Sequence, residues 1–177
     1  GQKEQVVSMV QTLSDFFRAS LNSGKDIVSL EGECRHITSY LQIQQVRYQD
    51  ILTYDVDIPE EIANCKIPKI TLQPLVENAL YHGIKNKRGK GRIVVTGRRE
   101  KDKCVIRVED NGIGMTKERL NQVRGGLTTK IEDSNDFYGL YNVNERIRLK
   151  FGEEYGLSID SVLQEGTCVE VWLPWES

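Results

Sequence analysis

Two pairs of alternating segments in the second half of the chain constrain its fold more than any other feature. Residues 92–99 and 103–110 form one pair and residues 156–162 and 167–173 the other, each joined by a short polar turn. Alternation of apolar and polar side chains is typical of β-strands that bury one face, and short turns favour neighbouring strands. Residues 52–58 (LTYDVDI) alternate in the same way and predict a further strand.

The spacing of apolar residues predicts helices before and between these strands. They cover about 6–21, 31–48, part of 66–85, 116–123 and 139–152. Gly24 is a stop signal for the first helix, and Pro74 is tolerable only in the first turn of the third. Adjacent strand pairs separated by helices favour an α+β fold: a mixed β-sheet covered on one face by helices and preceded by N-terminal helices. We expect a helical segment at 1–50 and an α/β domain at 51–177.

Composition limits the kinds of partner. The 177 residues carry a net charge of −2, whereas nucleic-acid-binding proteins usually have a clearly basic face, so we expect no nucleic-acid partner. The basic run at 85–92 (KNKRGKGR) is interpreted as a solvated loop. No apolar run approaches the ~18 residues needed to cross a bilayer. The chain begins in a helical pattern without a cap, so we expect it to be part of a longer protein.

The four cysteines lie far apart and form no C-x-x-C pair. Cys104 and Cys168 lie in strand patterns, which indicates buried free thiols in a reducing compartment. Cys34 and His36 form one isolated pair, which disfavours a metal site. We expect His36 at the surface of the second helix.

The segment 110–115 (DNGIGM), at the end of a predicted strand, has two interpretations. Asn111-Gly112 is a common turn sequence, but a turn alone does not explain Asp110 and Gly114. Alternatively, the glycines remove side chains so that a flat base or a ribose can approach the backbone. The carboxylate of Asp110 would then accept a hydrogen bond from an exocyclic amine such as that of adenine.

The helix within 66–85 carries a polar face that is also open to two interpretations. Asn78, His82 and Lys85 are spaced i, i+4 and i+7, so they share one face opposite an apolar one. Asn78 offers the kind of oxygen that Mg²⁺ accepts beside phosphate oxygens, and Lys85 can pair with phosphate. Glu77, one residue off this face, is placed to orient or deprotonate an attacking group. The alternative is an amphipathic helix whose polar side faces water.

Two further segments are candidates for ligand contacts. Gly139 opens a helix after a loop at 125–136 that lacks periodicity, and helix N-termini bind phosphate through free N–H groups. Residues 165–167 (EGT) connect the last two strands, where a plain hairpin turn and a ligand contact both remain open.

Taken in order, LVENALYHG, DNGIGM, the loop, YGLYNVNERI and EGT resemble the ATP-binding domain of sensor histidine kinases. This superfamily, with the Bergerat-type fold, also includes gyrase and MutL. ITLQPLVENALYHGIK and GLYNVNERIRLKFGEEYGLSI resemble the LytS/YesM-like subfamily of two-component kinases in particular. The resemblance covers nearly the whole chain, because residues 14–48 are similar to the segment that precedes that domain.

The resemblance implies ATP and Mg²⁺ as cofactors. Asn78 would bind Mg²⁺, and Glu77 would assist the phosphoryl acceptor. His82, Gly83 and Lys85 would lie at the phosphates and the ribose.

The resemblance also assigns the adenine end of the site. Asp110 would accept the adenine amine, while Gly112, Gly114 and Met115 would shape the pocket. Gly166–Thr167 would close the adenine side.

The lid and phosphate positions include a departure from the family pattern. Residues 125–136 would be the ATP lid, with Gly139 and Leu140 beneath the phosphates. The second glycine box usually reads G-x-G-L, but here it is FYGL, with Phe137 at the first glycine. The lid is therefore expected to hinge differently, or Phe137 to cover the nucleotide.

The phosphate-accepting histidine of the subfamily lies in a motif like NPHF, which this sequence lacks. The resemblance therefore implies a catalytic fragment that transfers the ATP γ-phosphoryl to a histidine on an upstream segment of the same protein. The partners implied are a second copy in a homodimer and the receiver domain of a response regulator. The intact protein would be a bacterial cell-membrane sensor, with this chain in the cytoplasm.

Two other functions compete with this one. The first is a related ATPase or serine-directed kinase on the same scaffold. The second is an interaction module that has lost turnover; Phe137 favours it, whereas Asn78, Asp110, Gly112 and Gly114 oppose it.

Overall fold

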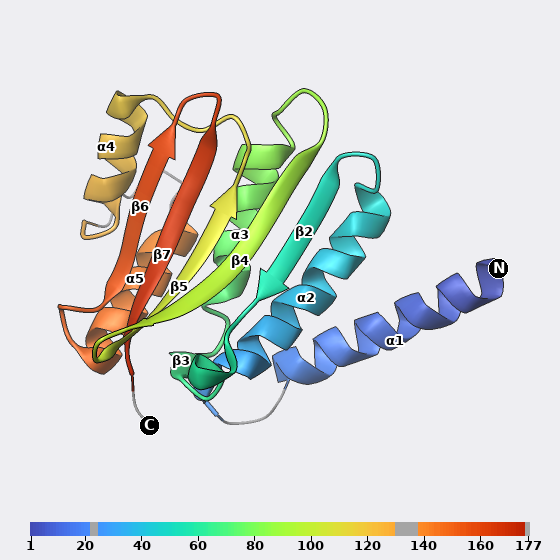
Figure 1. Ribbon diagram of the computed structural model, residues 1–177, viewed down its shortest axis with the longest axis horizontal. Helices are drawn as coiled ribbons and strands as arrows, with labels where there is room; N and C mark the ends of the chain where they lie inside the picture. Colours follow the sequence, from blue (N-terminus) through green and yellow to red (C-terminus); the bar gives the residue numbers. More distant parts are fainter. Residues whose placement is uncertain (22–24, 130–137, 176–177) are drawn as a thin grey trace.

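The computed structural model describes residues 1–21, 25–129 and 138–175, and within them the chain forms a five-stranded sheet (Figure 1). In spatial order the strands are β2 (Leu52–Asp57), β4 (Gly91–Glu100), β5 (Lys103–Asp110), β7 (Gly166–Pro174) and β6 (Gly156–Val162). β2 pairs with β4 in parallel, and the other neighbours are antiparallel. The predicted mixed sheet, with its two strand pairs, is therefore confirmed.

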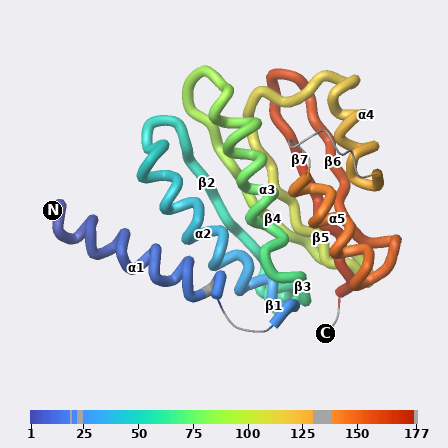
Figure 2. Tube along the Cα trace, turned by 180° about the vertical axis from the view of Figure 1, so that it is seen from behind, coloured from blue at the N-terminus to red at the C-terminus, as the bar shows by residue number. Residues whose placement is uncertain are grey.

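Helices cover one face of this sheet; they lie behind it in Figure 1 and in front of it in Figure 2. They are α2 (Leu30–Arg47), α3 (Leu72–Asn78) with its continuation η2 (Ala79–Ile84), α4 (Lys117–Gly126) and α5 (Tyr138–Phe151). Ser29 and Thr116 cap α2 and α4 through their hydroxyl groups. Pro74 lies in the first turn of α3, as predicted.

The start of α3 is capped by an acid from another helix. Thr71 makes no side-chain cap bond. Instead, the carboxylate of Glu33, on α2, accepts the N–H groups of Ile70, Thr71 and Leu72 at 2.7 to 3.1 Å. These are free donors at a helix N-terminus, where a negative charge is also favourable. Glu33 therefore fixes α3 to α2, which its position in the sequence did not reveal.

The first helix, α1 (Gln2–Leu21), packs on α2 and extends beyond the sheet (Figure 1). Its predicted apolar stripe is largely uncovered, with Val6, Val10, Phe17 and Leu21 each more than half exposed. The predicted stop at Gly24 lies outside the described residues.

His36 is buried, with 4% of its surface exposed, so its predicted surface position was wrong. The ring of Phe16 stacks on it, with centroids 4.7 Å apart and planes 16° from parallel. The helical spacing of α2 alone does not show that α1 covers this side of the helix.

Some short elements escaped the sequence analysis. β1 (Ile27–Ser29) and β3 (Lys66–Pro68) form an antiparallel two-stranded ladder of three residue pairs apart from the main sheet, and a 3₁₀ turn spans Glu60–Ile62. Such short pairings leave no periodicity to detect. β3 also occupies part of the segment in which only a helix was predicted.

One hydrophobic cluster joins α2 to the sheet, through residues such as Leu30, Ile37 and Leu41. The division into residues 1–50 and 51–177 stays a prediction. Cys34, Cys65 and Cys104 are buried and form no disulfide bond, whereas Cys168, which was predicted to be buried, is partly exposed. None of the helices in the described ranges combines the length and apolar character needed to cross a bilayer.

Candidate functional site

A cavity of about 350 Å³ lies between the α3–η2 helix and the ends of β5 and β7. That volume is in the usual range for small-molecule sites. Eight of the residues predicted to bind the nucleotide line it: Asn78, His82, Gly83, Asp110, Gly114, Met115, Leu140 and Thr167. The fold thus brings together residues that are up to 89 positions apart in the chain.

Asp110 is almost fully buried, with 7% of its surface exposed, at the end of β5. Its Oδ1 accepts the Gly112 N–H at 2.8 Å, and the backbone of Thr167, its partner in β7, also bonds it. Burial nevertheless raises the pKa of Asp110 to about 6, and these backbone bonds only partly oppose the shift. A buried carboxyl group that lines a cavity and has a pKa shifted toward neutral pH is typical of a binding or catalytic group.

The helix that carries Asn78 changes from α to π geometry directly after that residue. The Lys85 N–H bonds the carbonyl of Leu80, five residues earlier, at 2.8 Å. π-turns within helices occur frequently at functional sites. Because each π turn contains more residues than an α turn, Lys85 is rotated out of the i, i+4, i+7 face and does not line the cavity. Its ammonium lies 5.5 Å from the Tyr81 ring centroid.

Close backbone contact explains the glycines around Asp110. A Cβ on Gly83 would lie 2.5 Å from Asp110 Oδ1, and one on Gly112 would lie 2.3 Å from the carbonyl carbon of Gly83. Gly114 has φ +61°, and its Cβ would be 1.9 Å from the Val162 carbonyl oxygen. The protein's own backbone thus lies against Gly112 and Gly114, while Gly114 also lines the cavity. The predicted approach of a nucleotide to these glycines stays a prediction.

Five predicted site residues lie outside the cavity lining: Glu77, Lys85, Gly112, Gly139 and Gly166. Glu77 accepts a hydrogen bond from Gln73 Nε2 at 2.9 Å. Gly139 faces Pro74 at the start of α3. Phe137 and most of the predicted lid lie outside the described residues, and Gly125 belongs to α4 rather than to a loop.

Several residues that line the cavity were not predicted from the sequence. The polar ones are Asn86, Thr116 and Arg119; the apolar walls include Leu75, Ala79, Val108, Ile113 and Val169. Alternation along β5 and β7 would have identified Val108 and Val169 as inward-facing. Arg119 had a weaker signal, as a cation one turn after the capping residue Thr116.

Comparison with known families matches residues 68–177 to the family described as histidine kinase-, DNA gyrase B- and HSP90-like ATPase. Residues 1–52 match the family described as histidine kinase. The chain is 36% identical over 175 residues to sensor histidine kinase YesM of Bacillus subtilis, covering 98% of this chain and 28% of YesM. It is 34% identical over 175 residues to sensor protein LytS of Staphylococcus saprophyticus, covering 98% and 29%. The chain therefore spans less than a third of these relatives.

Solved structures share the fold at low sequence identity. A histidine kinase domain of a blue-light activated histidine kinase from Erythrobacter litoralis EL346 has a TM-score of 0.61 at 15% identity, covering 94% of this chain and 72% of that one. The catalytic domain of histidine kinase ThkA has a TM-score of 0.62 at 10% identity, covering 84% and 95%.

Proposed function

Because the chain belongs to the histidine kinase-, DNA gyrase B- and HSP90-like ATPase family, we propose that its cavity binds ATP with Mg²⁺ for phosphoryl transfer to a protein histidine. The family matches and the similarity to YesM and LytS confirm the resemblance read from the sequence. Residues 68–177 form the ATP-binding domain of this family.

The observation that carries the proposal is that Asp110 and Asn78 line the same cavity. Asp110 presents a buried acceptor among apolar walls, which suits the amine edge of a flat base. Gly83 and Gly114 leave no side chain in the lining beside it, and Thr167 adds a polar edge from β7. These features fit a purine at the Asp110 end of the cavity.

Asn78 lines the cavity, and its side chain carries an amide oxygen, a hard ligand of the kind that Mg²⁺ takes. As the one proposed protein ligand, Asn78 would hold Mg²⁺ together with phosphate oxygens of the nucleotide. Bound there, Mg²⁺ would neutralise developing charge on the phosphates. His82, Gly83 and Leu140 also line the cavity and are proposed to contact the phosphates or the ribose.

We further propose that the acceptor is a histidine on a segment upstream of residue 1. Glu77 would orient or deprotonate it, and Lys85 and Gly139 would lie near the phosphates. A response-regulator receiver domain would take the phosphoryl group. The uncovered stripe on α1 supports a homodimer, because a second copy of the helix would bury it. Attachment of the intact protein to a bacterial membrane, with this chain in the cytoplasm, is part of the same proposal.

Titration with ATP and Mg²⁺, followed by addition of a domain that carries the upstream histidine, tests the function. Binding and transfer of the γ-phosphoryl are expected. Binding with steady release of free phosphate alone would instead indicate a related ATPase. No binding would indicate an interaction module.

Replacing Asn78 with alanine should remove most of the contribution of Mg²⁺ to ATP affinity. We expect affinity in saturating Mg²⁺ to fall about tenfold, equivalent to about 1.4 kcal/mol, with little change when Mg²⁺ is chelated. Calorimetric titration in both conditions measures the difference. Asn121→Ala, an exposed change on α4, is the matched control. Equal losses with and without Mg²⁺ would contradict the metal role.

ATP affinity should fall as the pH is lowered through about 6, because that is the pKa of buried Asp110. Only the ionised carboxyl accepts the amine with full strength, so the loss approaches about tenfold per pH unit. The stability of the free protein should respond in the opposite sense. Because the pKa of Asp110 is higher in the folded than in the unfolded protein, the carboxyl stabilises the fold at a pH below its unfolded-state pKa. This contribution to the free energy of unfolding is lost as the pH rises through about 6. Identical pH profiles for the unaltered protein and Asp110→Asn would refute the assignment.

A further inference from the structure

Glu77 is held by a chain of hydrogen bonds that begins on another helix. His36 Nε2, on α2, lies 2.7 Å from Gln73 Oε1. Gln73 Nε2 in turn donates to Glu77 Oε1 at 2.9 Å, one turn further along α3. The proposed function assigns no role to these two hydrogen bonds.

The chemistry of the three side chains decides which group donates and which accepts in each hydrogen bond. Gln73 turns its NH₂ group to Glu77 and its carbonyl oxygen to His36, and a carbonyl oxygen can only accept hydrogen bonds. Nε2 of His36 must therefore carry a proton. Nδ1 is buried without a hydrogen-bond partner among the described residues, so the bond to Gln73 is made through Nε2.

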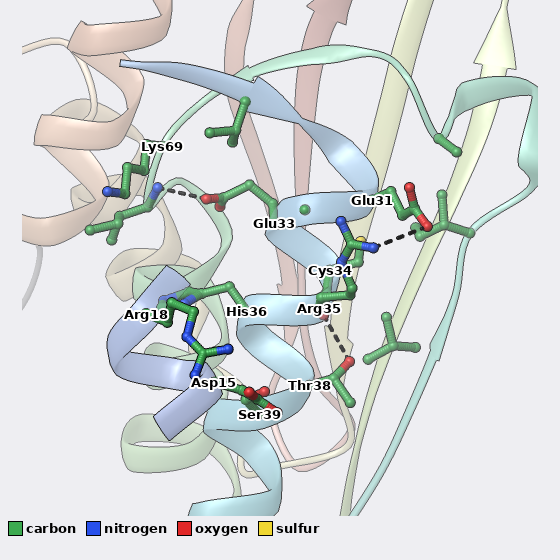
Figure 3. A pocket seen from close by; sticks show the side chains of 16 residues that line it. Asp15, Arg18, Glu31, Glu33, Cys34, Arg35, His36, Thr38, Ser39 and Lys69 are labelled. Carbon is green, nitrogen blue, oxygen red and sulfur yellow. Dashed lines mark hydrogen bonds and ion pairs between the residues drawn. The ribbon is translucent and has the colours of Figure 1, made fainter. Parts of the chain in front are cut away.

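The residues on both helices that make these hydrogen bonds are themselves held in place. Phe16 of α1 stacks on the His36 ring and limits its rotation. Glu33, one turn before His36, holds the N–H groups at the start of α3. Figure 3 shows the side chains of Glu33 and His36 leaving α2 toward the same side. The position of the His36 ring relative to the backbone of α3 is thus fixed. Gln73 bridges the ring and Glu77.

A second residue of α2 approaches the same carboxylate. Tyr40 lies one turn after His36 and is buried. Burial raises the pKa of the Tyr40 hydroxyl well above its usual range, and the negative charge of Glu77 adds to this shift. Tyr40 and the pair of His36 and Gln73 thus link α2 to Glu77.

We propose that Gln73 and His36 are positioning residues that hold the Glu77 carboxylate in one rotamer for the phosphoryl acceptor. The inference rests on the proposed role of Glu77. A free glutamate side chain has up to about 2 kcal/mol of conformational entropy to lose, and a misplaced catalytic group slows reaction markedly. Without these hydrogen bonds, transfer should slow while the nucleotide cavity, which neither Gln73 nor His36 lines, keeps its affinity.

Three variants of the intact protein, including its acceptor segment, separate this role from packing. Gln73→Leu and His36→Phe should lower the rate constant of transfer at saturating ATP by about tenfold and change the Kd for ATP by less than about twofold. His36→Gln should restore most of the rate, because its amide N–H replaces that of Nε2. A purely structural role predicts the reverse order, since His36→Phe keeps an aromatic ring against Phe16 and His36→Gln does not. Thermal unfolding of each variant reports the packing effect separately.

Glu77→Gln distinguishes failure of this inference from failure of the proposed function. If Glu77→Gln slows transfer but Gln73→Leu and His36→Phe do not, the positioning role is wrong and the function stands. Absence of transfer in the unaltered protein, or full transfer by Glu77→Gln, would overturn the function or the role of Glu77, and the positioning role with it.

Discussion

Asp110→Asn should weaken ATP binding by about 100-fold and leave the fold intact. Asparagine has the same shape, but its neutral oxygen cannot match a carboxylate as an acceptor. Hydrogen bonds to charged groups contribute about 1.5–3 kcal/mol, which corresponds to roughly 10–150-fold in affinity. Calorimetric titration at pH about 7.5, above the Asp110 pKa of about 6, keeps the unaltered carboxyl ionised.

Asp160→Asn provides the control for this substitution. Asp160 is an exposed carboxylate on β6, outside the cavity lining, and bonds Arg124 at 3.3 Å. Its replacement should change ATP affinity by less than about twofold, as expected for an exposed ion pair. Inosine triphosphate gives a second check, because it has a carbonyl oxygen where adenine has an amine. Asp110→Asn should favour it relative to ATP; an unchanged preference would contradict amine recognition.

Gly112→Ala should lower the free energy of unfolding by at least about 2 kcal/mol and abolish nucleotide binding. Its Cβ would lie 2.3 Å from the carbonyl carbon of Gly83 and 2.4 Å from its Cα. Both contacts are with backbone, so no side-chain rotation can relieve them, and overpacking of this kind costs about 1–3 kcal/mol or more. Separation of the turn from η2 would also displace the Gly112 N–H from Asp110.

Gly125→Ala is the matched control for Gly112→Ala. A Cβ on Gly125 meets no atom within 4 Å, and the residue lies in α4. Alanine there should leave stability unchanged or raise it by up to about 1 kcal/mol, because glycine is the poorer helix former. Chemical denaturation measures both variants. Equal stability of the two would show that the turn and η2 are not in contact in solution.

The elements with the strongest periodicity were predictable from the sequence. β5 and β6 have the expected bounds, and α2, α4 and α5 differ by only one to three residues at their ends. Asp110, Gly114 and Asn78 were identified from residue chemistry and the family resemblance, and all line one cavity. Local patterns sufficed because each of these elements buries a regular face.

The departures arise where distant segments touch. Lys85 left its predicted face because α3 continues as a π turn around Asp110, a contact between residues more than 20 positions apart. His36 is buried because α1 folds over α2. Gln73 and Glu33 gained their roles through contacts between α2 and α3. No pattern within a single helix reports what packs against it.

By itself, the amino-acid sequence determined the α+β class, the order of helices and strands and the residue types able to hold a purine nucleotide, because these depend on local periodicity and chemistry. The tertiary structure alone decided which of those residues share a cavity, which glycines are required by backbone contact, and which side chains hold Glu77. Those properties depend on how close in space the fold brings segments that are far apart along the chain.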